Sequence, residues 1–234
     1  MKFENTEVWG FEHAIRGMRN PLESWGKSDS GCKLYCSVEG VCVEKPCSYD
    51  NCNGCTTTEY IIGKNDLELM QKLIKAGSEH RKFLRQIFVA VDITAPLYFF
   101  KELDTYKVGT VANSTSTMHK LASTPITLDC FEMDDFEDCK DDSNVYVSAI
   151  WIESITRLEK LRQKYNATKD KRYWKELIRL LPESWLQKRT ITMNYENILN
   201  MYRQRKNHKL TEWSKSFCDW VKTLPYAEEL ICLE

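Results

Sequence analysis

The chain has 234 residues, of which 42% are hydrophobic, and its seven Trp, eleven Tyr and nine Phe supply enough apolar surface to exclude disorder of the whole chain. This length suits one large domain or two small ones, because single hydrophobic cores stop growing at roughly 250 residues or slightly above, and one domain is the default expectation. Lys and Arg number 33 against 34 Asp and Glu, so the formal charge of −1 excludes a global field that would attract nucleic acid, and phosphate binding requires local basic clusters.

The N-terminal and apolar segments bear on location. The opening MKFENTEVWGFEHAIRG has no apolar run between a basic start and a small-residue cleavage site, so it does not match a secretory signal. The longest strongly apolar stretch, Ile87 to Phe100, is interrupted by Asp92 and is too short to cross about 30 Å of hydrocarbon. We therefore expect no membrane span and a cytoplasmic location.

The first 58 residues fall into two parts of different composition. Within residues 1–25, the phrase RGMRNPLESW predicts a short helix broken at Asn20-Pro21. Residues 26–58 are rich in Gly, Ser, Asp, Asn and Cys. Such a segment is not expected to form a helix or strand core unless contacts from outside the segment hold it in place. We expect a single domain over residues 1–234, with residues 26–58 as a cysteine-rich inserted module.

Six of the ten cysteines lie in this module, in the pattern Cys-x3-Cys-x5-Cys-x4-Cys-x4-Cys-x2-Cys. Thiolate clusters of this density hold Zn or an iron–sulfur cluster, and a reducing compartment favours a metal or free thiols over structural disulfides. A metal site and a reduced or partly disulfide-bonded loop both stay open. The candidate metal ligands are Cys32, Cys36, Cys42, Cys47, Cys52 and Cys55.

Regular structure is predicted from Asn65 onwards. Asn65-Asp66-Leu67-Glu68 has the spacing of a capping box, and the apolar residues after it form one helical stripe that Gly77 closes. Alternating apolar residues from Phe83 to Ile93 predict a strand with both faces largely covered. Thr94-Ala95-Pro96 then predicts the start of a buried helix over LYFFKELDTYKVG.

The second half of the chain is predicted to be mainly helical. ANSTSTMHK, rich in small hydroxyl residues, is expected to be a loop or a frayed helix end. The acidic residues 130–143 are expected to form a solvated connection rather than a cation site. Beyond them the spacing predicts helices over 145–165 and 171–181, a short strand over 189–193, and final helices over 194–205 and 208–224.

Three segments together resemble the flavin-dependent thymidylate synthases. DLELMQKLIKAGSEHRKFLRQIFVAV is similar to the helix, Gly turn and strand that precede that family's active site, and DITAPLYFFKELDTYKVGTVANSTSTMH is similar to its strand, helix start and RHRxxSxNExSxRY loop. Asn194, Asn200 and Arg205 match the spacing of two flavin-contacting asparagines and a nucleotide-contacting arginine. The resemblance spans roughly residues 66–225 and implies an α/β (α+β) fold, with a central antiparallel or mixed sheet flanked by helices.

The departures from the family pattern lie at its chemical centre. Thr105, Tyr106 and Lys107 stand where the family has Arg-His-Arg, so two of three cationic or titratable groups are lost. Glu102 stands where the family has a glutamine that contacts the uracil nucleotide. We expect the Asn113–Thr117 loop to supply hydroxyls and amides, and Lys107, Arg205 and Arg203 to supply charge, in place of the lost arginines. The alternative is a flexible Ser/Thr loop beside solvated basic side chains.

The second half of the loop matches the family in part. With one inserted residue, Asn113 and Ser116 align with the loop's Asn and Ser, while Ser114 replaces its Glu. Met118 and His119 replace its Arg and Tyr. An imidazole titrates near neutral pH, so His119 is a candidate proton carrier, with a hydrogen-bonded structural histidine as the alternative.

The resemblance implies an enzyme that binds FAD and dUMP and methylates dUMP reductively to dTMP with methylenetetrahydrofolate and NAD(P)H. It also implies a homotetramer with sites between subunits. The implied roles are catalysis by Ser116 and His119, cofactor binding by Arg81, Lys107, Asn113, Asn194, Asn200 and His208, and substrate binding by Glu102, Ser114, Ser116 and Arg205.

Each role has a structural alternative. On one straight helix Asn194 and Asn200 project about 240° apart, so either the helix begins after Asn194 or the two side chains reach different parts of one ligand. Arg205 is also placed to interact with a helix C-terminus, and Arg81 lies in a segment typical of a surface turn. The alternatives to the enzyme are a non-catalytic nucleotide-binding or interaction protein on the same fold, and a related enzyme that modifies another pyrimidine nucleotide.

Overall fold

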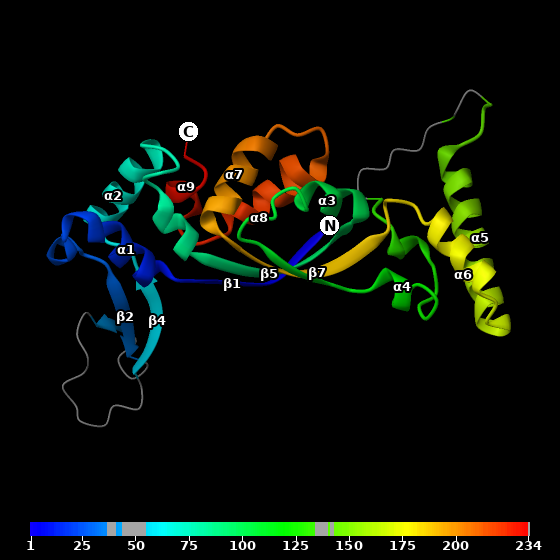
Figure 1. The fold of residues 1–234 in the computed structure, drawn as a ribbon, viewed down its shortest axis with the longest axis horizontal. Coiled ribbons are helices and arrows are strands. Elements are labelled where there is room, and N and C mark those ends of the chain that lie inside the picture. The colour runs from blue at the N-terminus through cyan, green and yellow to red at the C-terminus, as the bar shows by residue number, and fades with distance from the viewer. Residues whose placement is uncertain (37–40, 44–54, 134–139, 141–142, 234) are drawn as a thin grey trace. The chain divides into compact units, whose positions relative to one another are not determined.

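The computed structural model describes residues 1–36, 41–43, 55–133, 140 and 143–233, without the side chains of residues 33–36, 41–43 and 55–59 (Figure 1). The chain forms two compact units, each assembled from three segments. Unit 1 comprises Met1–Glu7, Ala90–Thr192 and Gln204–Trp220, and unit 2 comprises Val8–Val89, Met193–Arg203 and Val221–Glu234. Within the described residues, no helix has both the length and the apolar character that crossing a bilayer requires.

A four-stranded sheet has the order β1-β5-β7-β6. Its strands are β1 (Lys2–Trp9), β5 (Phe88–Pro96), β6 (Val111–Ser114) and β7 (Leu186–Asn194). Edge strand β6 is exposed along its length and runs antiparallel to β7, with Asn113 opposite Thr190 and Ser114 opposite Arg189. The expectation of a loop or frayed helix for ANSTSTMHK is therefore wrong for its first residues, because pairing with β7 extends them.

Strand β5 buries one face and leaves the other partly open. Val89, Val91 and Ile93 are at most 1% exposed, as their alternation predicts. The opposite face carries Phe88, which is 37% exposed, and Asp92, whose carboxylate accepts hydrogen bonds from Asn5 and Thr190. The prediction that both faces are largely covered is thus wrong for this polar face. The strand also begins later than predicted, because residues 82–86 form a 3-10 turn.

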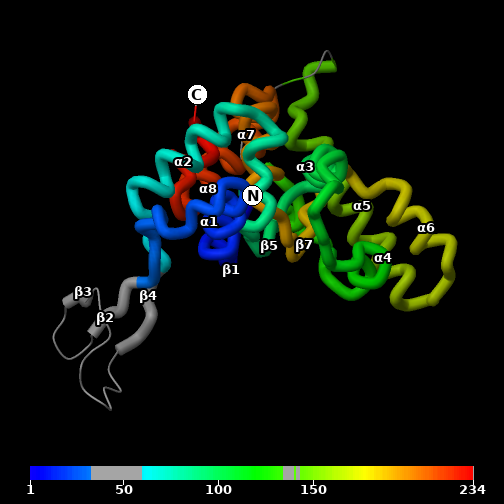
Figure 2. The backbone as a smooth tube through the Cα atoms, turned by 60° about the vertical axis from the view of Figure 1, so that its left-hand side comes forward, coloured from blue at the N-terminus to red at the C-terminus, as the bar shows by residue number. Residues whose placement is uncertain are grey.

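Unit 1 has a helical hairpin whose two arms lie side by side in both views (Figures 1 and 2). Its helices α5 (Val147–Thr168) and α6 (Lys171–Leu180) agree with the amphipathic helices predicted here. Asp170 caps α6 by accepting the backbone N–H of Arg172 at 2.9 Å. The hairpin packs its apolar side on a core of Leu121, Ile126, Phe131, Ile155, Leu158, Leu177 and Trp185.

A second apolar cluster in unit 1 is aromatic. It joins α3 (Leu97–Leu103) to the C-terminal helical segment, where Trp213 stacks on Phe99 with ring centroids 4.3 Å apart. The single helix expected over 208–224 is replaced by a π-helix, Glu212–Phe217, followed by α8 (Cys218–Lys222). Trp213, Phe217 and Trp220 are all buried, as their shared helical face predicts. The remaining short helix of this unit is α4 (Thr117–Lys120).

Unit 2 is mainly helical. Its helices are α1 (Phe11–Arg19), α2 (Lys64–Lys75), α7 (Tyr195–Arg205, which ends in unit 1) and α9 (Ala227–Leu230), with 3-10 turns at Asn20–Leu22, Trp25–Lys27 and Lys82–Gln86. The predicted break of the first helix at Asn20-Pro21 is confirmed. The start of α1 requires glycine, because Gly10 has φ +100° and an added Cβ would lie 2.1 Å from the carbonyl oxygen of Gln86.

A three-stranded antiparallel sheet in unit 2 has the order β3-β2-β4, from β2 (Gly31–Cys36), β3 (Val41–Val43) and β4 (Cys55–Ile61). Asp66 holds the polar segment before this sheet in place. It is fully buried and accepts hydrogen bonds from Arg19, Ser28 and Ser30 at 2.6 Å each. Asp29 caps α2 by accepting the backbone N–H groups of Asn65 and Asp66. The predicted capping box at Asn65 is therefore wrong, because a distant aspartate satisfies these donors.

Candidate functional site

The side chain of Arg81 is held by α7 in unit 2. Its Nε donates to Glu196 Oε1 at 3.2 Å and its Nη2 donates to Asn200 Oδ1 at 3.0 Å. Glu196 and Asn200 are four residues apart, so they lie on one face of the helix. Arg85 donates to the other carboxylate oxygen of Glu196. The structure thus brings together Arg81 and Asn200, two of the predicted cofactor ligands.

This cluster has a surplus of positive charge. Burial alone would raise the pKa of Glu196, but hydrogen bonds from Arg85 and Arg81 outweigh it and lower that pKa, so the carboxylate stays ionised. Arg203 has its pKa lowered by partial burial and then by the charge of Arg81. Arg203 as a whole residue is exposed, and the described residues give its side chain no hydrogen bond or ion pair. An anion at this place would relieve the repulsion between Arg203 and Arg81.

Arg205 lies in a second cluster, in unit 1. Its Nη2 is 2.6 Å from Glu102 Oε2, and its Nε donates to the hydroxyl of Tyr106 at 3.0 Å. Tyr106 in turn donates to Gln204 Oε1 at 2.8 Å, and the guanidinium stacks 5.1 Å from the ring centroid of Trp213. The predicted substrate ligands Glu102 and Arg205 are therefore direct partners, with their side chains 40% and 16% exposed.

The signature-loop residues occupy an exposed part of unit 1. Asn113 and Ser114 lie on β6, and Lys107 lies in the turn before it. Ser116 is the N-cap of α4, where its Oγ accepts the backbone N–H of His119 at 3.3 Å. The structure thus places Ser116 next to His119, with the imidazole exposed.

Asn194 and His208 both have local structural contacts. Helix α7 begins at Tyr195, which settles the geometric alternative: Asn194 precedes the helix and Asn200 lies within it. Asn194 Oδ1 accepts the backbone N–H of Asn197 at 3.0 Å, and Asn197 Oδ1 accepts that of Asn194 at 3.1 Å, so the two cap the helix reciprocally. His208 Nδ1 accepts the backbone N–H of Leu210 at 3.2 Å.

The cysteine module is described only in part. Cys32 is exposed, while the side chains of Cys36, Cys42 and Cys55 and the whole of Cys47 and Cys52 lie outside the described residues. The described parts of the chain contain no group of three His, Cys, Asp or Glu side chains placed to bind a metal ion. A metal on the six cysteines stays a prediction.

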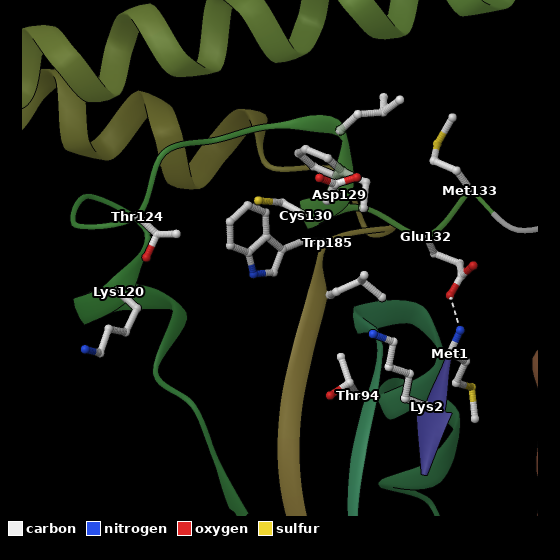
Figure 3. A pocket seen from close by; sticks show the side chains of 13 residues that line it. Met1, Lys2, Thr94, Lys120, Thr124, Asp129, Cys130, Glu132, Met133 and Trp185 are labelled. Atoms are coloured by element: carbon white, nitrogen blue, oxygen red, sulfur yellow. Dashed lines mark hydrogen bonds and ion pairs between the residues drawn. The ribbon is translucent and has the colours of Figure 1, made fainter. Parts of the chain in front are cut away.

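Unit 1 also contains a cavity of about 740 Å³ between the start of β1, the end of β5, the start of β7 and the segment around Cys130 (Figure 3). The indole of Trp185 and the Lys2 side chain line it, and Glu132 Oε2 accepts a hydrogen bond from the Met1 nitrogen at 3.1 Å. None of the predicted catalytic, cofactor or substrate residues lines this cavity.

Comparison with known proteins places this geometry in a known architecture. No protein-family model and no curated protein matches the sequence. Two crystal structures of the flavin-dependent thymidylate synthase ThyX from Helicobacter pylori, complexed with FAD and dUMP, match the structure at 16% identity. The TM-scores of the two matches are 0.64 and 0.66. The first match covers 100% of both chains, and the second covers 99% of this chain and 97% of the ThyX chain.

The chain has the ThyX fold. The combination of helices with antiparallel sheets that the resemblance predicted is thereby confirmed. The sequence predicted Arg81, Asn200, Glu102 and Arg205 as ligand contacts, and these stay predictions; it did not point to Glu196, which orients Arg81. The signal that would have found Glu196 is its spacing of four residues from Asn200, which places a carboxylate beside any cation that the asparagine contacts.

Proposed function

We propose that the protein is a flavin-dependent, thymidylate synthase-like enzyme that binds FAD and dUMP. Its ThyX-like fold over the whole chain supports this, since both matching ThyX structures hold FAD and dUMP. The observation that carries the proposal is the contact of Arg81 with Asn200 beside Arg203. A flavin dinucleotide brings two phosphates, and paired cations with an amide are the groups that bind phosphates.

The cofactor cluster fits a phosphate-bearing ligand by its donor chemistry. Glu196 and Asn200 fix the guanidinium of Arg81, so little side-chain entropy is lost on binding. Arg203 supplies a charge that the described residues leave unneutralised. Bound flavin supplies hydride transfer, while the chain's own residues hold and orient it. Lys107, Asn113, Asn194 and His208 are proposed as further cofactor contacts.

The substrate end of the proposal involves Arg205. A nucleotide monophosphate is an anion, and the carboxylate of Glu102 would repel it unless a cation compensates. The 2.6 Å pair with Arg205 provides that compensation, and Tyr106 fixes the guanidinium from a second direction. Ser114 and Ser116 would supply hydroxyl donors to the nucleotide, and His119 would carry a proton at the reacting ring.

The complete reaction would transfer one carbon from methylenetetrahydrofolate to dUMP and use NAD(P)H to reduce the flavin. We propose a homotetramer of single-domain subunits with residues 26–58 as an insertion, located in the cytoplasm. A metal on the six cysteines would be Zn or an iron–sulfur cluster. An iron–sulfur cluster would colour the purified protein brown, whereas bound flavin would colour it yellow with an absorption band at about 450 nm.

A second candidate is a non-catalytic nucleotide-binding or interaction protein on the same fold, or a related enzyme for another pyrimidine nucleotide. The contacts of Arg205 with Glu102 and Tyr106 favour a non-catalytic protein, because a nucleotide would have to compete with these contacts for the guanidinium. Colourless protein that does not bind FAD in a titration would support this candidate against the first.

Substitution of Arg205 tests the nucleotide site. We expect Arg205→Ala to weaken dUMP binding about 10- to 100-fold in calorimetric titration, since a charged hydrogen bond to an anion is lost. Arg157→Ala is the matched control, because that arginine is 72% exposed and, among the described residues, pairs only with Glu153 on its own helix. Equal dUMP affinity of Arg205→Ala and wild type, with unchanged thermal unfolding, would remove Arg205 from the site.

A further inference from the structure

Unit 2 contains a cavity of about 400 Å³ that the proposed flavin and nucleotide contacts do not use. It lies between the end of β1, the start of α1, β2, β4 and the turn that precedes α9. Its volume is in the range of small-molecule sites. Aromatic rings dominate its lining, contributed by Trp9, Phe11, Tyr60 and Tyr226.

These rings are held in place by their own contacts. Phe11 is 7% exposed and meets Tyr226 edge-on with centroids 5.7 Å apart. The Tyr226 hydroxyl accepts the backbone N–H of Ile62 at 2.9 Å, and Tyr226 has φ +55°, a conformation that non-glycine residues rarely adopt. Trp9 stacks on Phe88 and keeps 45% of its surface exposed. The cavity is therefore largely preformed, with one accessible indole at its rim.

The electrostatic environment of the cavity is negative. Glu12 and Cys32 line it, and none of the described lining residues is a lysine or an arginine. The pKa of Tyr60 is raised to about 12, first by burial and then by the nearby carboxylates of Asp66 and Glu12. Of these groups, Glu12 lines the cavity and would attract a cation, whereas Asp66 is already paired with Arg19. His13 also lines the cavity.

We propose that this cavity binds a compact organic cation, an alkylammonium group enclosed by the aromatic rings with Glu12 as its counter-ion. Aromatic faces attract cations through the ring quadrupole and accept the methyl groups of a quaternary ammonium as apolar contacts. A metal ion would need several oxygen, nitrogen or sulfur ligands, and the described residues bring no three such groups together. The same chemistry occurs in free quaternary amines and in methylated lysine side chains.

Calorimetric titration with choline tests the proposal, and 3,3-dimethylbutanol, its neutral isostere, is the control ligand. We expect choline to bind at least about 10-fold more tightly than the isostere, because only the cation gains from the rings and from Glu12. Equal affinities would overturn the proposal, and so would the absence of choline binding at about 10 mM.

Two variants locate the binding. We expect Trp9→Ala to weaken choline binding about 10-fold and Glu12→Gln about 3-fold, since each removes one cation-attracting group. Trp25→Ala is the matched control, because Trp25 is 49% exposed in the same unit and does not line the cavity. Unchanged affinity in both cavity variants would overturn the assignment. A trimethyl-lysine peptide that binds more tightly than choline would identify a protein partner, and equal affinity would identify a free amine.

Discussion

Glu159 shows how one side chain joins segments of unit 1. Its carboxylate accepts hydrogen bonds from Arg162 and Gln163 on its own helix and from the backbone N–H of Ile126 at 2.8 Å. The bond from Arg162 is the main reason why the pKa of Glu159 is lowered from 4.5 to about 2, and it outweighs the opposing effect of burial. The ionised form is therefore the one that the folded state stabilises.

Glu159→Gln should lower the stability of the protein in a pH-dependent way. A depressed folded-state pKa contributes stability that is fully present above the unfolded value of 4.5 and is lost as the pH falls towards about 2. We expect the difference in free energy of unfolding between wild type and Glu159→Gln to be constant from pH 7 to pH 5 and to shrink below it. Urea unfolding at several pH values measures this. A difference that grows on acidification would contradict the assignment.

At the level of elements, Asp66 connects α2, the end of α1 and the base of the three-stranded sheet. Besides the three hydrogen bonds at 2.6 Å, its Oδ2 accepts the backbone N–H groups of Asp29 and Ser30 at 3.2 Å each. Burial alone would raise the pKa of Asp66, but hydrogen bonds from Ser28, Ser30 and Arg19 lower it overall. The carboxylate thus neutralises Arg19, which is 4% exposed.

Asp66→Ala should destabilise the protein by about 3 to 5 kcal/mol, because it leaves the Arg19 guanidinium buried without its partner. The free energy of urea unfolding measures the effect. Asp170→Ala, which removes the side-chain cap of α6, is the matched control and should lower the free energy of unfolding by much less than Asp66→Ala. Similar losses in the two variants would show that the buried pair contributes no more than an ordinary cap.

Elements with a strong internal pattern were predictable from the sequence, and elements that depend on distant partners were not. Helices α5 and α6 follow from their amphipathic spacing, and the buried face of β5 follows from its alternation. Strand β6 has the composition of a loop and is extended because it pairs with β7, about 80 residues away in the chain. The cap of α2 comes from Asp29 and not from the local Asn65, so local spacing gave the wrong hydrogen-bond acceptor.

The roles predicted for the candidate site residues stay predictions, and the contacts among these residues could not be predicted from the sequence. The family spacing selects Asn200 and Arg205, and the structure places each beside a predicted partner, Arg81 and Glu102. The role of Tyr106 as the hydrogen-bond acceptor of Arg205 could not be predicted, because the family pattern has a histidine there. Asn194 was predicted as a flavin contact, and its amide is engaged in capping α7.

At the scale of the whole molecule, the ThyX-like fold was found from motif order and spacing, although identity to the matching ThyX structures is 16%. A chain adopts a given fold when its apolar periodicity and turn residues agree with that fold, and many different sequences meet this requirement. Function depends on fewer groups, and those in the signature loop differ from the family pattern. The central claim is therefore that Arg81, Asn200 and Arg203 still form a phosphate site for FAD.

Titration of FAD into the wild type and into Arg203→Ala, followed by calorimetry and absorption at about 450 nm, tests this claim most directly. Arg203 makes no hydrogen bond or ion pair within the described residues, so its removal should leave the thermal unfolding unchanged. We expect wild type to bind FAD and Arg203→Ala to bind it about 10-fold more weakly, with Arg157→Ala as the unaffected control. Wild-type protein that binds no FAD, or an Arg203→Ala variant with wild-type affinity, would contradict the account.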